Sequence, residues 1–226
     1  TRIKDVRRIL KVRKKHDHKG TFGHALLVAG SYGKMGAAVL ASRAALRAGL
    51  GLLTTHIPKC GYNIIQSTVP EAMVLVDHDE EIFTGACEPG LYATVAVGPG
   101  LGQDARTIKA LTKLLEQCDK PMVLDADALN ILSANRHLLG ILPAGSILTP
   151  HPKEFERLVG SWKNDFERLA LQRQMAADFS VVVVLKGAHT AVATPRGEVY
   201  FNSTGNPGMG TGGSGDVIRR WRRCWR

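Results

Sequence analysis

The sequence contains no long apolar run and few cysteines. No stretch approaches the roughly 18 consecutive apolar residues of a membrane-spanning helix, and the basic first 20 residues lack the apolar segment of a signal peptide. The four cysteines, Cys60, Cys87, Cys118 and Cys224, have neither metal-ligand spacing nor a C-x-x-C pair. We therefore expect a cytoplasmic protein with reduced thiols, one domain and no membrane association.

Two common nucleotide-binding fingerprints are also missing. The loop 30–36 (GSYGKMG) lacks the terminal Lys-Ser/Thr of a Walker loop, and no G-x-G-x-x-G with a downstream acid is present. Their absence disfavours NAD as a tightly bound hydride-transfer cofactor. The loops 30–36 and 98–102 remain candidate phosphate turns of another kind.

The net charge of +10 is concentrated at the two ends of the chain. Residues 1–19 carry a net charge of +7 and residues 219–226 carry +5, so the residues between them carry −2. Nucleic-acid-binding domains usually place their basic residues on a folded face. The distribution therefore disfavours nucleic acid as a partner, with a protein that binds RNA through its basic ends as the alternative.

Short β-branched runs alternate with helical patterns over the body of the chain. The predicted strands are residues 24–30, 52–57, 94–97, 122–124, 146–148, 180–185 and 198–202. The predicted helices are residues 36–49, 104–117 and 153–159, with apolar residues at helical spacing. This alternation is typical of βαβ units, and it predicts an α/β domain with a largely parallel sheet.

A glycine-rich stretch that ends on an aspartate is the sharpest chemical motif. Residues 208–217 read GMGTGGSGDV. Glycines let the backbone approach an anion, and successive N–H groups at a helix start form an anion hole, here Gly212, Gly213, Ser214 and Gly215. Asp216 beside that hole would accept the proton of an attacking hydroxyl during phosphoryl transfer. A flexible loop with a helix-capping aspartate is the alternative.

Polar residues follow other predicted strands, at the edge where open α/β sheets bind ligands. Lys186 to Thr190 follows the most apolar strand, and its lysine suits a phosphate unless the segment is only a surface turn. His151 lies between two prolines, which hold its ring at a strand end for a functional or a structural purpose. Asp125 and Asp127, separated by one residue, are expected to point to the same side and to serve hydrated Mg²⁺ or substrate hydroxyls, or else to cap a helix over residues 128–133.

Seven segments in sequence order resemble the NAD(P)H-hydrate dehydratase family. They are residues 19–31 (KGTFGHALLVAGS), 36–38 (GAA), 97–102 (VGPGLG), 124–130 (LDADALN), 149–154 (TPHPKE), 185–190 (LKGAHT) and 206–216 (NPGMGTGGSGD). The resemblance implies a ribokinase-like three-layer α/β/α domain over residues 19–217, after a basic segment 1–18. It also implies a lyase that repairs the S form of hydrated NADH or NADPH (NADHX, NADPHX). A nucleotide phosphorylates the ring hydroxyl, and loss of phosphate regenerates the dihydronicotinamide.

The resemblance further implies residue roles and partners. The hydrated dinucleotide would contact Ala37, Gly102, His151 and Asp216, with Asp216 as the catalytic base. The nucleotide would contact Lys186, Gly187, Ala188, His189, Thr190 and Gly215. We expect Mg²⁺ with ADP rather than ATP, a homo-oligomer, and a fused NAD(P)H-hydrate epimerase domain before Thr1. The alternatives are a ribokinase-like kinase of a small vitamin alcohol and a nucleotide-binding remnant without turnover.

Residues 218–226 (IRRWRRCWR) depart from the family pattern, which continues into an apolar helix. If the arginine codons are CGN, reading one frame over gives small and apolar residues at helical spacing, so we hypothesise a frameshift. A genuine basic tail is the alternative. We expect the domain to lack its C-terminal helices and to be poorly stable and weakly active.

Overall fold

The computed structural model describes residues 14–85 and 87–202, whose nine strands form one sheet. The strand order is β3-β2-β1-β4-β5-β6-β7-β8-β9. The strands are β1 (His24–Val28), β2 (Leu52–Ile57), β3 (Met73–Val76), β4 (Thr94–Val97), β5 (Met122–Leu124), β6 (Ile147–Leu148), β7 (Val182–Leu185), β8 (Thr190–Ala193) and β9 (Val199–Asn202). All pairs from β3 to β7 are parallel, whereas β7, β8 and β9 pair antiparallel. The prediction of a mostly parallel sheet is confirmed.

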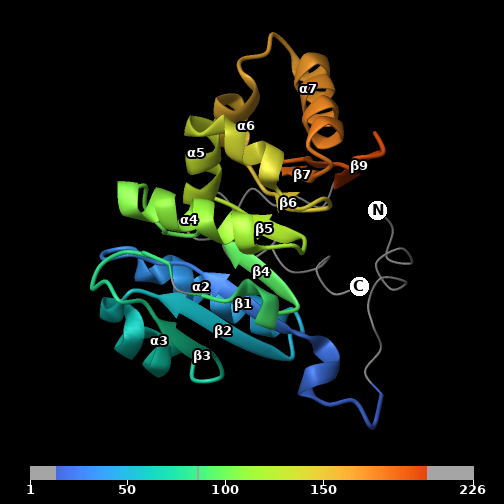
Figure 1. The fold of residues 1–226 in the computed structure, drawn as a ribbon. Coiled ribbons are helices and arrows are strands. Elements are labelled where there is room, and N and C mark those ends of the chain that lie inside the picture. Colours follow the sequence, from blue (N-terminus) through green and yellow to red (C-terminus); the bar gives the residue numbers. More distant parts are fainter. Residues whose placement is uncertain (1–13, 86, 203–226) are drawn as a thin grey trace.

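Six α-helices in the described part of the chain cover the two faces of this sheet. They are α2 (Met35–Arg47), α3 (Tyr62–Thr68), α4 (Ala105–Gln117), α5 (Asp127–Ala134), α6 (Pro152–Val159) and α7 (Asp165–Asp178). Leu26 and Val28 of β1 pack in a core with α4 to α7, whereas Ala25 and Leu27 pack with α2 and α3. A parallel strand whose residues alternate between two cores must be apolar throughout. Figure 1 shows the resulting three layers, with the sheet running from β3 to β9.

The predicted elements match the observed ones to within about two residues, but four elements were missed. Strands β2, β4 and β5 have the predicted bounds, and α4 begins after Asp104, whose side chain accepts a hydrogen bond from the Arg106 amide as an N-cap. The missed elements are α3, β3, α7 and β8. Strand β3 is an apolar run of only four residues, too short to be assigned from its pattern alone, and the polar Gln172 occupies a buried position of α7.

The chain reverses its direction of travel across the sheet between β1 and β4. Strands β2 and β3 extend the sheet on one side of β1, and β4 returns to the other side. Ligands bind at such a switch point, beyond the carboxyl ends of the strands. Gly98 follows β4 there with a φ of +128°, and a Cβ at this position would lie 1.8 Å from the carbonyl oxygen of Asp125. Only glycine permits this close packing of the β4 turn against the end of β5.

The helices of the described ranges are all too short or too polar to span a lipid bilayer.

Candidate active site

Two of the expected substrate contacts come together at the switch point. Ala37 lies in α2, and a Cβ on Gly100 would be 3.1 Å from the Ala37 Cβ. Gly102 belongs to the same turn as Gly100, and a Cβ on Gly102 would lie 3.9 Å from the Ser31 Oγ. The Ser31 hydroxyl donates a hydrogen bond of 2.7 Å to the Gly100 carbonyl. The loop after β1 and the loop after β4 are therefore tied to each other on this side of the site.

Asp127, the first residue of α5, fixes the turn after β4. Its Oδ2 accepts a hydrogen bond of 2.8 Å from the Gly102 amide. The Lys34 Nζ lies 3.6 Å from the same oxygen, in a pair whose lysine is 55% exposed and whose aspartate is 16% exposed. Asp127 thus joins three loops at the carboxyl edge of the sheet.

Asp125 makes a different and more deeply buried ion pair. Its Oδ1 accepts a hydrogen bond of 2.9 Å from the Lys186 Nζ, and the two side chains are 3% and 16% exposed. Ala126, between the two aspartates, has a φ of +50°, a region that costs energy for a non-glycine residue. Asp125 and Asp127 therefore contact different partners, Lys186 for the first and Gly102 for the second.

His151 is the N-cap of α6, and its two ring nitrogens have different surroundings. Nδ1 accepts hydrogen bonds from the amides of Lys153 and Glu154, at 3.1 and 3.2 Å. A neutral ring with this acceptor carries its proton on Nε2, which makes Nε2 a donor. Burial lowers the pKa of His151, as do Lys186 and Arg157, while the Glu154 carboxylate opposes this change. The side chain is 45% exposed, so His151 caps α6 while part of its ring stays accessible.

The segment Lys186 to Thr190 forms the turn between β7 and β8. Gly187, Ala188 and His189 are exposed, whereas Thr190 is buried and its hydroxyl donates to the Gly187 carbonyl at 3.2 Å. The Lys186 amide donates to the Pro150 carbonyl at 2.8 Å, which brings this turn beside His151. The segment is thus a surface turn, and it lies at the carboxyl edge of the parallel strands.

Several expected site residues lie outside the described residues. They are Gly212, Gly213, Ser214, Gly215 and Asp216, and with them the tail 218–226. Sequence reasoning missed two charged side chains that the structure brings to the edge, Lys34 and Glu154. The spacing of His151 and Glu154 was a usable signal, because an acid three residues after an N-cap is typical of a capping box.

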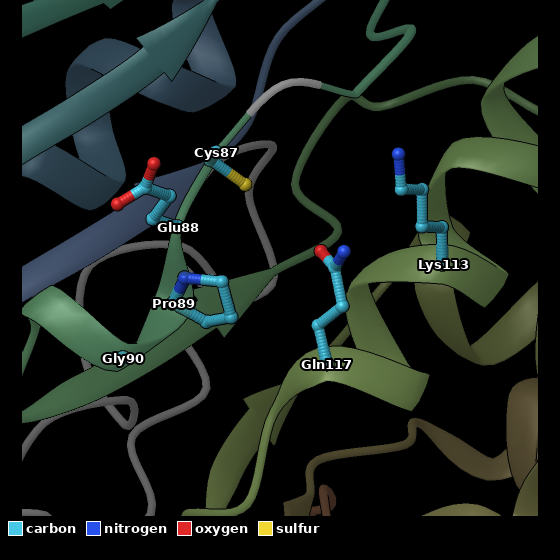
Figure 2. A pocket seen from close by; sticks show the side chains of 6 residues that line it. All are labelled: Cys87, Glu88, Pro89, Gly90, Lys113 and Gln117. Carbon is cyan, nitrogen blue, oxygen red and sulfur yellow. The ribbon is translucent and has the colours of Figure 1, made fainter.

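A hollow of about 450 Å³ lies at the opposite edge of the sheet, near the point where β4 begins. Figure 2 shows its lining, with Cys87, Glu88, Pro89 and Gly90 before β4, and Lys113 and Gln117 on the last turns of α4. Burial raises the pKa of the Cys87 thiol to about 11, and the charge of Asp77 adds to this effect. The thiol therefore stays protonated at neutral pH, and the hollow contributes nothing to the candidate site.

The nine-stranded sheet and the polar loops at its carboxyl edge define a ribokinase-like α/β protein. A ribokinase-like superfamily protein from Enterococcus faecalis V583 is similar in structure, with a TM-score of 0.81, 26% identity, and coverage of 94% of this chain and 74% of that one. A family model described as NAD(P)H-hydrate dehydratase matches residues 25–219. The chain belongs to the NAD(P)H-hydrate dehydratase family.

Two relatives illustrate the likeness. The bifunctional NAD(P)H-hydrate repair enzyme Nnr of Moorella thermoacetica is 40% identical over 211 residues, which cover 89% of this chain and 40% of that protein. The crystal structure of the ADP/ATP-dependent NAD(P)H-hydrate dehydratase from Bacillus subtilis, co-crystallized with ATP/Mg²⁺, has a TM-score of 0.78 and 34% identity. That match covers 95% of this chain and 76% of the solved chain. The chain thus spans less than half the length of the bifunctional relative.

Proposed function

We propose that this chain catalyses the nucleotide-dependent dehydration of the S form of hydrated NADH or NADPH. Membership of the dehydratase family is the observation that carries the proposal. The likeness to the Bacillus subtilis enzyme, named as ADP/ATP-dependent, supports the nucleotide requirement. ADP, which would leave as AMP, is the favoured phosphoryl donor.

The reaction has two steps. The ring hydroxyl of the hydrate attacks the terminal phosphorus of the nucleotide, loses its proton to a base, and becomes a phosphate ester. Elimination then breaks the carbon–oxygen bond, releases inorganic phosphate, and restores the ring double bond as a proton leaves the neighbouring carbon. Phosphoryl transfer depends mainly on positioning and charge stabilisation, so the protein must align two anionic ligands.

The two sides of the site suit the two ligands. Ala37, Gly102 and His151 would contact the hydrated dinucleotide, with the His151 Nε2 as a hydrogen-bond donor. Lys186, Gly187, Ala188, His189 and Thr190 would hold the nucleotide, where the Lys186 ammonium favours phosphate. Gly212 to Gly215 would form the anion hole beside the catalytic base Asp216, all of them outside the described residues.

Magnesium would arrive with the nucleotide. No three His, Cys, Asp or Glu side chains form a metal-binding cluster within the described part of the chain. Mg²⁺ usually keeps several waters and binds one or two carboxylates together with substrate phosphates. Asp127, a carboxylate at the ligand edge, fits that donor set, and the ion would neutralise charge on the transferring phosphate.

The full proteins of the bifunctional type contain more than this domain. The chain covers 40% of the Moorella thermoacetica protein, so an epimerase domain preceding these residues remains part of the proposal. A homo-oligomeric assembly is proposed on the family resemblance alone.

The test follows the absorbance of dihydronicotinamide as it returns from hydrated NADH, with ADP or ATP and Mg²⁺. The proposal expects recovery that depends on the nucleotide and disappears in Asp216→Asn. An inactive chain is retested with the reading frame corrected after Val217, which also tests the frameshift hypothesis. Failure of both proteins would contradict the proposed function.

A further inference from the structure

We propose that Glu154 is a positioning residue that holds His151 and Lys186 in one fixed arrangement, and so joins the two sides of the site assigned above. Glu154 lies in the first turn of α6 and is only 6% exposed. A carboxylate is seldom buried so deeply unless it is paired or accepts hydrogen bonds. The proposal rests on the proposed function, because that function gives each side its ligand.

On the substrate side, Glu154 and His151 bind each other reciprocally. The Glu154 Oε2 accepts a hydrogen bond of 2.7 Å from the His151 amide, while the His151 Nδ1 accepts one from the Glu154 amide. The second carboxylate oxygen, Oε1, lies 3.5 Å from the His151 Nε2. Glu154 therefore contacts the backbone of His151 through its side chain and the ring through its amide, in the manner of a capping box.

On the nucleotide side, the same carboxylate faces the lysine. The Glu154 Oε2 is 3.7 Å from the Lys186 Nζ, which also donates to Asp125. The Lys186 amide donates to the Pro150 carbonyl, one residue before His151. One oxygen atom of Glu154 thus lies between the His151 backbone and the Lys186 ammonium.

This arrangement makes the two sides interdependent. A loss of charge at Glu154 removes one of the groups that position the Lys186 ammonium and one that orients the His151 ring. Small displacements matter, because a misplacement of about 1 Å can cost a factor of about 100 in a reaction between positioned groups. Glu154 acts through its neighbours and is not itself assigned a contact with either ligand.

The experiment compares Glu154→Gln with Glu156→Gln, an identical change at an exposed position of the same helix. The dissociation constants of Mg-ADP and of hydrated NADH are measured by calorimetry, beside the midpoint of thermal unfolding. We expect Glu154→Gln to weaken both ligands by about tenfold, and Glu156→Gln to stay within about twofold of the unaltered chain. A purely structural role would lower the unfolding midpoint and leave the affinity of the folded molecules unchanged.

A second readout needs no ligand. The ring nitrogens of His151 are followed by ¹⁵N NMR, with the signals assigned through His151→Gln, and the unaltered chain is expected to show the neutral form protonated at Nε2. Glu154→Gln should shift these signals, and Glu156→Gln should not. Unchanged His151 signals, or weakening of only one ligand, would overturn the proposal. Failure of the unaltered chain to bind hydrated NADH would instead count against the proposed function.

Discussion

Two lysine–aspartate pairs flank Ala126, and they differ in burial. Lys186 lies 2.9 Å from Asp125 in a pair whose side chains are 16% and 3% exposed, whereas Lys34 lies 3.6 Å from Asp127 and is 55% exposed. Water screens an exposed pair, so its net contribution to stability is small. A buried pair has lost the hydration of both ions, so the removal of one partner is costly. We therefore expect the lysine–aspartate pairs on the two sides of the site to contribute unequally to stability.

The largest effect is expected from Lys186→Met, which keeps the length of the side chain and removes its charge. The Asp125 carboxylate stays buried without the cation now 2.9 Å from it, and the expected loss in the free energy of unfolding is about 3 kcal/mol. Urea unfolding followed by circular dichroism measures it. A loss below about 1 kcal/mol would place this pair with ordinary surface pairs.

The second prediction isolates the pair itself through the double variant Asp125→Asn with Lys186→Met. The double variant leaves no buried charge from this pair. Its loss in the free energy of unfolding should therefore be smaller than the sum of the two single losses by about 2 kcal/mol. The matched cycle at Asp127 and Lys34 should give a coupling of about 0.5 kcal/mol or less. Equal couplings in the two cycles would contradict the comparison.

A third pair, His56 with Asp77, is also buried, and its histidine can lose its charge. The His56 Nε2 lies 3.2 Å from the Asp77 Oδ2, and the side chains are 1% and 0% exposed. Burial lowers the pKa of His56 below its ordinary 6.5, although Asp77 opposes the change. The folded state thus binds fewer protons than the unfolded state, so this contribution to stability is complete above pH 6.5 and is lost as the pH falls through the lowered pKa.

The measurement compares urea unfolding at pH 7.5 and 5.5 for the unaltered chain and for His56→Phe. The unaltered chain should lose about 1 kcal/mol more than the variant over this range. His24 and His151 also have lowered pKa values but are present in both proteins, so the difference reports His56. An equal loss in the two proteins would show that His56 is not the group responsible.

The glycine turns of the site could be predicted from the sequence, whereas the pairing of its charged side chains could not. Gly98 and Gly102 could be recognised from the spacing of glycines after a buried strand, because a tight turn imposes that requirement locally. The pairing of Lys186 with Asp125 joins residues 61 positions apart. Strand order alone decides which strand ends are neighbours, and no local pattern in the sequence encodes it.

The expectation that Asp125 and Asp127 point to the same side rested on an assumption that the structure contradicts. It assumed that the strand continues through Asp125 and Asp127, whereas β5 ends at Leu124. Ala126 then adopts a positive φ, which alters the course of the backbone between the carboxylates. Alanine gives no warning of this conformation, since asparagine and glycine are the residues that usually adopt it.

The smallest effect is expected from Lys34→Met. The exposed ammonium loses little hydration in its pair with Asp127, and the Gly102 amide still donates to that carboxylate, so the free energy of unfolding should change by less than about 1 kcal/mol. Whatever change occurs should shrink further at about 1 M salt, where the screening length falls to about 3 Å. Unfolding curves at low and high salt, with Lys186→Met beside them, test both points. A salt-independent loss of about 3 kcal/mol in Lys34→Met would mean that contact with Asp127, rather than burial, sets the strength of these pairs.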